Sequence, residues 1–141
     1  MDLTKSFLIK LPSHSDERGS LTVIENEGQL PFTIKRIFYI YDVPQEARRA
    51  SHAHYRLQEL IIPAAGSFTI TLDDGTNKQS FTLDRPDCGL YVPPLTWVEI
   101  EDFSAKATCL VFASAPYDAS DYCQDYPTFL KARSDNDNTI S

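Results

Sequence analysis

Short runs of apolar and aromatic residues alternate with turn residues along most of the chain. Seven of these runs are rich in the β-branched and aromatic side chains that favour strands. They cover residues 36–41, 57–62, 67–72, 79–83, 89–92, 96–100 and 108–114. Residues 73–77 read DDGTN, where Asp and Gly tolerate the positive φ of a hairpin connection between the third and fourth runs. The pattern predicts an all-β fold, either a sandwich or a barrel.

Helical patterning is limited to the C-terminal part of the chain. Ser120 and Asp121 are suitable caps for a short helix over residues 122–131, with Pro127 near its start or at a kink. The rough apolar face of this helix consists of Tyr122, Tyr126, Phe129 and Leu130. Residues 133–141 are polar without periodic apolar positions, and we expect a frayed tail there. A single domain over residues 1–132 is therefore predicted, followed by a polar tail.

Length and composition limit the possible function classes. The 141 residues fit one domain that can bury a core, and no apolar run approaches the length of a membrane span. The N-terminus lacks the basic start and sustained apolar stretch of a secretory signal, so we expect a cytoplasmic protein. The three cysteines, Cys88, Cys109 and Cys123, form no C-x-x-C pair, which argues against a disulfide framework and a zinc knuckle.

The charge distribution points away from nucleic acid and towards a small ligand. A formal net charge of −7 argues against non-specific binding to nucleic acid, because affinity for the phosphate backbone depends on surplus Lys and Arg. A small anionic ligand would need a local cluster of cations within this acidic chain. Arg48, Arg49 and Arg56 form such a cluster in the sequence, around a pair of histidines.

The most informative stretch is residues 51–66, which read SHAHYRLQELIIPAAG. Residues two apart on a strand point to the same face, so His52 and His54 would project together from that face. The pattern by itself is compatible with a metal site, with a site of proton transfer, or with an ordinary polar edge strand.

Four residues of this stretch, His52, His54, Glu59 and Gly66, match the first cupin motif, and GLYVPPLTW at residues 89–97 lies where the second motif falls. The chain therefore resembles a small cupin, a double-stranded β-helix or jelly-roll barrel, here with a short C-terminal helix. Further matching segments cover residues 16–25, 31–43, 48–54, 72–75 and 114–131. Together the segments resemble the sugar-nucleotide 3,4-ketoisomerases of the WxcM-like cupin family over about residues 6–131.

This resemblance implies an isomerase that needs no cofactor. Members of the family act on dTDP-4-keto-6-deoxy-D-glucose and move the carbonyl from C4 to C3 ahead of transamination. The pathways lead to aminodeoxy sugars of lipopolysaccharide O-antigen, of S-layer glycans or of antibiotics. The resemblance also implies a homodimer in which N-terminal strands cross to the partner subunit.

The same resemblance assigns candidate site residues. It places the catalytic pair on His52 and His54, an assisting tyrosine on Tyr39, an active-site arginine on Arg49, and a ligand-binding loop at Arg18. Carbonyl migration requires that a proton be taken from C3 and one returned to C4, and histidine can donate and accept protons near neutral pH. We expect His52 to be the base at C3 and His54 to carry a proton between the two oxygens.

Two further cations are candidates for binding the diphosphate or the charge of the enediolate. These are Lys35 and Arg36, and arginine suits bidentate contact with phosphate. Because successive residues of a strand face opposite sides, we expect at most one of them to enter the cavity. Several family members carry a polar or basic residue directly after the second-motif tryptophan, whereas this chain has Val98. This departure leaves the C4 configuration of the product open.

The possible metal ligands are few in this sequence. A cupin metal site combines the first-motif histidines and glutamate with a histidine of the second motif, which is absent here, and the third histidine is the N-terminal His14. The remaining candidates are His52, His54 and Glu59, with Glu99 or Glu101 as an added carboxylate. The resemblance implies catalysis without a metal, and we expect none.

Three other functions compete with ketone migration. A 3,5-epimerase would enolise the same kind of dTDP-4-ketosugar, but it commonly relies on a single histidine with an aspartate and a tyrosine, so the pair of histidines favours ketone migration. A metal-dependent oxygenase or isomerase is disfavoured by the missing second-motif histidine. A non-catalytic sugar-binding cupin would bind its ligand without turnover. The fold alone does not separate these functions.

Overall fold

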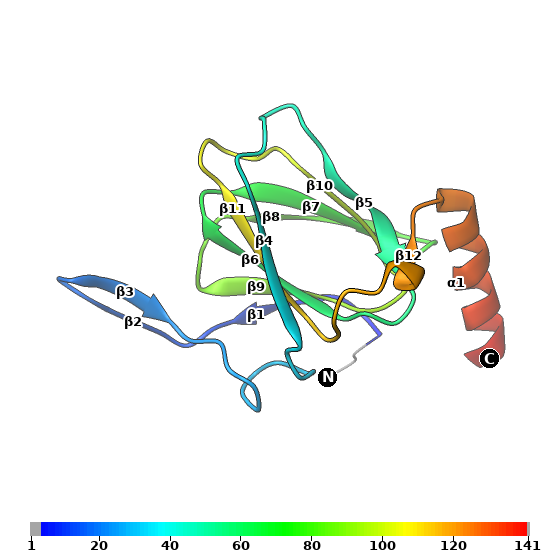
Figure 1. The fold of residues 1–141 in the computed structure, drawn as a ribbon, viewed down its shortest axis with the longest axis horizontal. Helices are drawn as coiled ribbons and strands as arrows, with labels where there is room; N and C mark the ends of the chain where they lie inside the picture. The colour runs from blue at the N-terminus through cyan, green and yellow to red at the C-terminus, as the bar shows by residue number, and fades with distance from the viewer. Residues whose placement is uncertain (1–3, 141) are drawn as a thin grey trace.

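Two five-stranded antiparallel sheets form the body of the protein in the computed structural model, which describes residues 4–140 (Figure 1). The first sheet has the order β1-β9-β6-β11-β4 and the second the order β12-β5-β10-β7-β8. The first sheet contains β1 (Phe7–Lys10), β9 (Cys88–Val92), β6 (Glu59–Ala65), β11 (Thr108–Ala113) and β4 (Arg36–Tyr41). The second contains β12 (Tyr122–Cys123), β5 (Arg49–His54), β10 (Trp97–Glu101), β7 (Phe68–Asp73) and β8 (Lys78–Leu83).

The remaining elements lie outside these two sheets. The strands β2 (Ser13–Asp16) and β3 (Gly19–Thr22) form a separate hairpin, and the 3-10 helix η1 (Ala119–Asp121) precedes β12. The helix α1 (Tyr126–Ile140) ends the described chain, and it lies at the opposite end of the molecule from the hairpin (Figure 1). Among residues 4–140, no helix has the length and apolarity that crossing a bilayer requires.

The facing sides of the two sheets enclose the main hydrophobic core. Apolar side chains occupy alternate positions of the central strands, as in β7, where Phe68, Ile70 and Leu72 are buried in this core. Leu90 of β9 and Val111 of β11 belong to the same cluster from the first sheet. This confirms the all-β jelly-roll expectation, although among the described residues no ladder of hydrogen bonds joins the two sheets into a closed barrel.

Apolar side chains also cover parts of the outer faces of both sheets. On the first sheet, Leu60, Ile62 and Tyr91 pack with residues of the N-terminal segment, which are Ile9, Leu11 and Phe32. On the second sheet, Trp97 packs under Phe129 of α1. The helix is therefore attached to the body by a small cluster near its first turns.

The predicted strands and the predicted hairpin are confirmed. Each of the seven apolar runs overlaps a strand. The strand β7 pairs with β8 around the DDGTN turn, where Gly75 has a φ of +93° and its N–H donates to Asp73 Oδ1 at 2.8 Å. The motif glycine Gly66 has a φ of +68°, and a Cβ there would lie 2.5 Å from Ser104 Oγ. The turn between β6 and β7 therefore leaves no room for a side chain at this position.

The predicted helix over residues 122–131 is wrong at its start. Asp118 caps η1 by accepting from the Ser120 N–H, and the next two residues extend the second sheet as β12, in which Tyr122 pairs with His54. The helix begins only at Tyr126, after Asp125, whose side chain accepts from the Thr128 N–H at 3.0 Å. Long-range pairing with β5 therefore takes the place of the helical conformation that the local sequence suggested.

The frayed tail predicted from residue 133 is also wrong for its described part, because α1 continues to Ile140; residue 141 lies outside the described residues. Arg133 donates to the Leu95 carbonyl at 3.1 Å and forms an ion pair with Asp137 at 3.5 Å, one helical turn further on. The part of α1 after residue 132 is mostly polar and contacts the body through Arg133. It has no apolar period, so hydrophobic patterning could not reveal it.

Replacement of Phe129 by alanine is expected to lower the free energy of unfolding by about 3–5 kcal/mol, because this fully buried ring packs on Trp97 and Tyr126. Leu130→Ala, at the next and more exposed position, is the matched control and should change that free energy by about 0.5 kcal/mol or less. Urea denaturation measures both variants. Equal losses would contradict the packing of α1 on the second sheet.

Candidate active site

A cavity of about 490 Å³ lies between the two sheets and contains both histidines in its wall. Its polar lining comes from Tyr39, Arg48, Arg49, His52, His54, Glu59, Tyr122 and Gln124. Its apolar lining includes Ile61, Val98, Ile100 and Val111. The volume lies within the range of ordinary small-molecule sites, and the mixture of an apolar floor with a few polar groups is typical of them.

A bulge in β5 turns Arg49 towards this cavity. Val98 pairs with His52 and Ile100 pairs with Arg49, so two steps on β10 correspond to three steps on β5. The extra residue lies at Ala50–Ser51, where both φ values are positive, +72° and +58°. A regular strand would have placed Arg49 on the opposite face from His52.

The two histidines lie side by side with a tyrosine against them. The His52 and His54 ring centroids are 4.9 Å apart with an interplanar angle of 84°, and the Tyr122 ring lies 5.1 Å from His52 and 4.3 Å from His54. Sequence reasoning missed Tyr122 as a site residue and assigned it to a helix face. A two-residue strand has no periodicity, so no pattern in the sequence marked this position.

Burial keeps both imidazoles neutral near neutral pH. It lowers the pKa of His52 below its ordinary value, against the opposing effect of a backbone hydrogen bond at Ala50. It lowers the pKa of His54 to about 3, with further contributions from His52 and the Arg36 cation. Each neutral ring has one N–H donor and one nitrogen acceptor, so it can both take up and release a proton.

Asp121 is a second site residue that the sequence reasoning missed, having treated it as a helix cap. Its Oδ2 lies 3.6 Å from Nδ1 of His54, and both side chains are buried. A smaller cavity of about 80 Å³ lies beside this contact and is lined by Arg36, His54, Arg56, Leu57, Ser114, Ala115, Pro116, Asp118, Asp121 and Tyr122. His54 therefore borders both cavities.

Glu59 is a buried acid in the wall of the larger cavity. Burial raises its pKa to about 7, against the opposing effect of the Arg36 cation. Burial also raises the pKa of the nearby Cys109 thiol to about 12, with a contribution from Glu59. Near neutral pH, Glu59 is therefore partly protonated and Cys109 stays a thiol.

Of the two neighbouring cations, Arg36 borders a cavity and Lys35 is exposed. The Arg36 guanidinium lies 5.0 Å from the Phe38 ring and 5.6 Å from the Tyr117 ring, in cation–π geometry. Its Nε is buried without a hydrogen-bond partner in the structure. Arg36 thus holds positive charge near His54 and Glu59.

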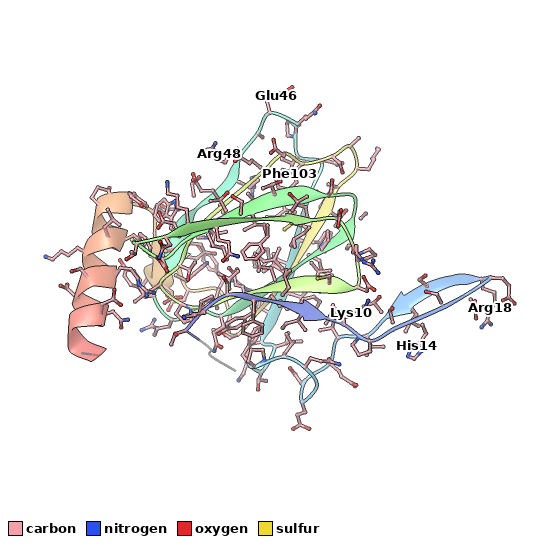
Figure 2. All side chains as sticks on the ribbon, turned by 180° about the vertical axis from the view of Figure 1, so that it is seen from behind. Lys10, His14, Arg18, Glu46, Arg48 and Phe103 are labelled. Atoms are coloured by element: carbon pink, nitrogen blue, oxygen red, sulfur yellow. The ribbon has the colours of Figure 1, made fainter. Side chains whose placement is uncertain are left out.

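Tyr39 and Arg18 are not brought to the histidines within one chain. Tyr39 lies at the rim of the cavity, but it is 61% exposed and its ring stacks on Tyr41 at 5.5 Å. Arg18 lies at the tip of the β2–β3 hairpin, which projects far from the sheets (Figure 2), and it pairs with Asp16 at 2.7 Å. His14 lies on the same hairpin (Figure 2).

The residues present do not fit a cupin metal site. Within residues 4–140, no group of three or more His, Cys, Asp or Glu side chains has a geometry that could hold a metal ion. The two carboxylates considered as additional ligands, Glu99 and Glu101, instead bind Arg48 at 3.4 and 2.9 Å. Glu99 shares its side of β10 with Trp97, opposite to Val98, which lies across from His52.

Comparison with known proteins gives consistent matches. The WxcM-like, C-terminal family (FdtA) matches residues 4–134. The chain is 45% identical over 116 residues to a TDP-4-oxo-6-deoxy-alpha-D-glucose-3,4-oxoisomerase of Aneurinibacillus thermoaerophilus, covering 82% of this chain and 84% of that protein. A solved 3,4-ketoisomerase from Helicobacter canadensis has a TM-score of 0.90 and 39% identity, covering 93% and 98% of the two chains. A histidine-to-asparagine mutant of the 3,4-ketoisomerase QdtA from Thermoanaerobacterium thermosaccharolyticum, in complex with TDP-4-keto-6-deoxyglucose, has a TM-score of 0.90 and 35% identity, covering 92% and 94%.

The matches extend over the whole body of the fold. The family match contains every strand from β1 to β12 and the first turns of α1. The two solved relatives each cover more than nine tenths of this chain. The cavity and both sheets lie within residues 4–134 of the family match. The chain therefore belongs to the WxcM-like, C-terminal family.

Proposed function

We propose that the protein is a dTDP-4-keto-6-deoxy-D-glucose 3,4-ketoisomerase that uses histidine acid/base catalysis. The observation that carries this proposal is the pair of neutral imidazoles in the wall of a cavity of about 490 Å³, with their ring centroids 4.9 Å apart. The curated relative with 45% identity bears the name of this activity, which supports the choice of substrate. We place the reaction in the cytoplasm and in the biosynthesis of aminodeoxy sugars such as those of lipopolysaccharide O-antigen.

The reaction moves two protons and leaves the composition of the sugar unchanged. In our assignment His52 takes the proton from C3, which gives an enediol across C3 and C4. His54 carries the hydroxyl proton from the C3 oxygen to the C4 oxygen, and a proton returned to C4 completes the 3-keto product. His52 is more exposed to solvent than His54, which is buried with 5% of its surface exposed.

Arg49 is the cation that we propose for the diphosphate and for the negative charge of the enediolate. It is exposed at the rim of the cavity on the same face as the histidines, so a ligand can reach it. Arg36 supplies a second positive charge near His54 and Glu59. Lys35 is exposed just before β4 and has no role in this proposal.

We also propose a homodimer with exchanged N-terminal strands. The outer side of the edge strand β4 presents Ile37, Tyr39 and Tyr41, each more than half exposed, and Leu21 is exposed on the β2–β3 hairpin. An isolated two-stranded hairpin is marginally stable in water, and this one stands away from the body (Figure 1). Exchange would cover these apolar side chains and would bring Arg18 and Tyr39 to a ligand.

One observation favours the 3,5-epimerase as a second candidate. Asp121 and Tyr122 lie beside His54, and a single histidine with an aspartate and a tyrosine is the set expected for that reaction. Both reactions begin with enolisation of the 4-ketosugar, so the fate of the carbonyl and the positions of exchange distinguish them.

Incubation with dTDP-4-keto-6-deoxy-D-glucose in deuterated buffer is expected to give a 3-keto sugar with deuterium at C4, observed by proton NMR. His52→Asn should lower the rate by roughly 10²–10⁴-fold, since it removes the proposed base, with an unchanged melting temperature as the control for folding. Exchange at C3 and C5 without carbonyl migration would instead establish the epimerase. Binding without any exchange would establish a non-catalytic protein.

The pH dependence of kcat/KM should show an acid limb displaced below about 6.5, the ordinary pKa of histidine. The base must be neutral, and burial lowers the pKa of both histidines, so the active form persists to lower pH than for an exposed imidazole. Any inflection near pH 7 that belongs to Glu59 should vanish in Glu59→Gln. An acid limb above the ordinary pKa of histidine would contradict this assignment.

Sedimentation velocity should give the mass of a dimer for the wild-type protein. Ile37→Lys should give a monomer, because it puts a charge on the outer side of β4 that the proposed interface covers. Gln79→Lys, an exposed position on the edge strand β8 of the other sheet, is the matched control and should remain dimeric. A monomeric wild-type protein would exclude the exchanged dimer.

A further inference from the structure

Asp121 approaches a ring nitrogen of His54 that has no hydrogen-bond partner among the described residues. Asp121 Oδ2 lies 3.6 Å from His54 Nδ1, and the two side chains are 8% and 6% exposed. Nδ1 is buried and accepts or donates no hydrogen bond within 3.5 Å in the described structure. At 3.6 Å the two groups are just beyond a formed hydrogen bond, a separation that catalytic pairs often close when substrate binds.

The backbone after β5 holds the Asp121 carboxylate in place. Oδ1 accepts from the Arg56 N–H at 3.0 Å and Oδ2 accepts from the Leu57 N–H at 3.1 Å. The backbone of Asp121 accepts from the Tyr55 N–H at 3.0 Å and donates to the Asp118 carbonyl at 3.0 Å. The carboxylate is thus fixed relative to the end of the strand that carries His54, so its position is set before any ligand arrives.

This arrangement selects one tautomer of His54. A neutral imidazole has one N–H and one lone-pair nitrogen, whereas an ionised carboxylate oxygen only accepts. Nδ1 must therefore carry the hydrogen, because the other tautomer would set two lone pairs against each other. Nε2 is then the acceptor, on a ring that borders the large cavity. The other charged or titratable groups around His54 are His52 on β5, Arg36 on β4, Glu59 on β6 and Tyr122 on β12. Arg56 also lines the small cavity with His54, and its Nε lies 3.5 Å from Asp121 Oδ1.

We propose that Asp121 is a positioning residue for His54, which holds Nε2 unprotonated towards the cavity and stabilises the imidazolium that forms during the reaction. This role rests on the proposed 3,4-ketoisomerase function. As the hydroxyl at C3 gives its proton to Nε2, the ring becomes a cation beside the Asp121 carboxylate. The proton then passes from Nε2 to the oxygen at C4 and the ring returns to neutral. Asp121 itself gains and loses no proton.

The first test reads the tautomer without substrate. The chain has three histidines, so the ¹⁵N resonances of His54 can be assigned by comparing the wild-type protein with His14→Asn and His52→Asn. Long-range ¹H–¹⁵N correlation at neutral pH should show a protonated Nδ1 and an unprotonated Nε2 for His54. A hydrogen on Nε2 would overturn the proposal, whether or not the protein turns over this substrate.

The second test measures kinetics in a matched pair of variants. Asp121→Asn keeps the size of the side chain and one acceptor but removes the charge, so kcat should fall by roughly 10²-fold while KM changes by less than about threefold. The acid limb of the rate profile should move to lower pH to the extent that it reports His54, because loss of a nearby anion disfavours the imidazolium. Asp118→Asn is the control, since Asp118 contacts Ser120 and Arg56 but not His54, and kcat should stay within about twofold.

The outcomes separate positioning from a purely structural role. If Asp121 only holds residues 55–57, Asp121→Asn should lower the melting temperature but leave kcat per folded molecule and the pH profile unchanged, which would overturn the proposal. If the variant does not fold, the tautomer of the wild-type protein still decides the question. A wild-type protein without isomerase activity refutes the proposed function, whereas an active one with an inert Asp121 refutes only the present inference.

Discussion

The bulge in β5 is the local constraint on which the site depends. In a regular strand Arg49 would face away from His52, and the cavity would lose the guanidinium that now lies on the same face as the two histidines. The extra residue at Ala50–Ser51 turns Arg49 to the same face as His52. It requires two left-handed φ values, each of which costs roughly 1–3 kcal/mol. The Ser51 hydroxyl donates to Glu99 at 3.2 Å, and pairing resumes on both sides of the bulge, so the surrounding ladder maintains this backbone.

Burial is the second constraint, and it acts on acids and bases in opposite directions. The same desolvation that lowers the pKa of His54 to about 3 raises that of Glu59 to about 7, so both groups favour their neutral forms. An apolar wall that includes Ile61 and Val98 keeps water from solvating charge there. Arg49, by contrast, is exposed at the rim. The cavity thus has two neutral imidazoles in its wall and the Arg49 guanidinium at its rim.

Other parts of the chain cover the two sheets unevenly. The inner faces cover one another, the N-terminal segment covers the outer face of the first sheet, and α1 covers part of the second. The outer side of β4 is different, because Ile37 and Tyr41 remain more than half exposed on an edge strand. The β2–β3 hairpin forms a separate two-stranded sheet that projects from the body (Figure 2). Both features lie on the N-terminal side of β5.

The sequence by itself determined the seven strands β4 and β6 to β11, the hairpin between β7 and β8, and the common face of His52 and His54, because side-chain alternation and turn preference depend on neighbouring residues. Its motifs also indicated the family to which the comparisons assign the chain. Only the tertiary structure decided that Tyr122 joins a strand, that Asp121 meets His54, and that Arg49 faces the cavity. Each of these depends on pairing or packing with residues far away along the chain. Local patterns do not record such contacts, because they arise only when the two sheets have assembled.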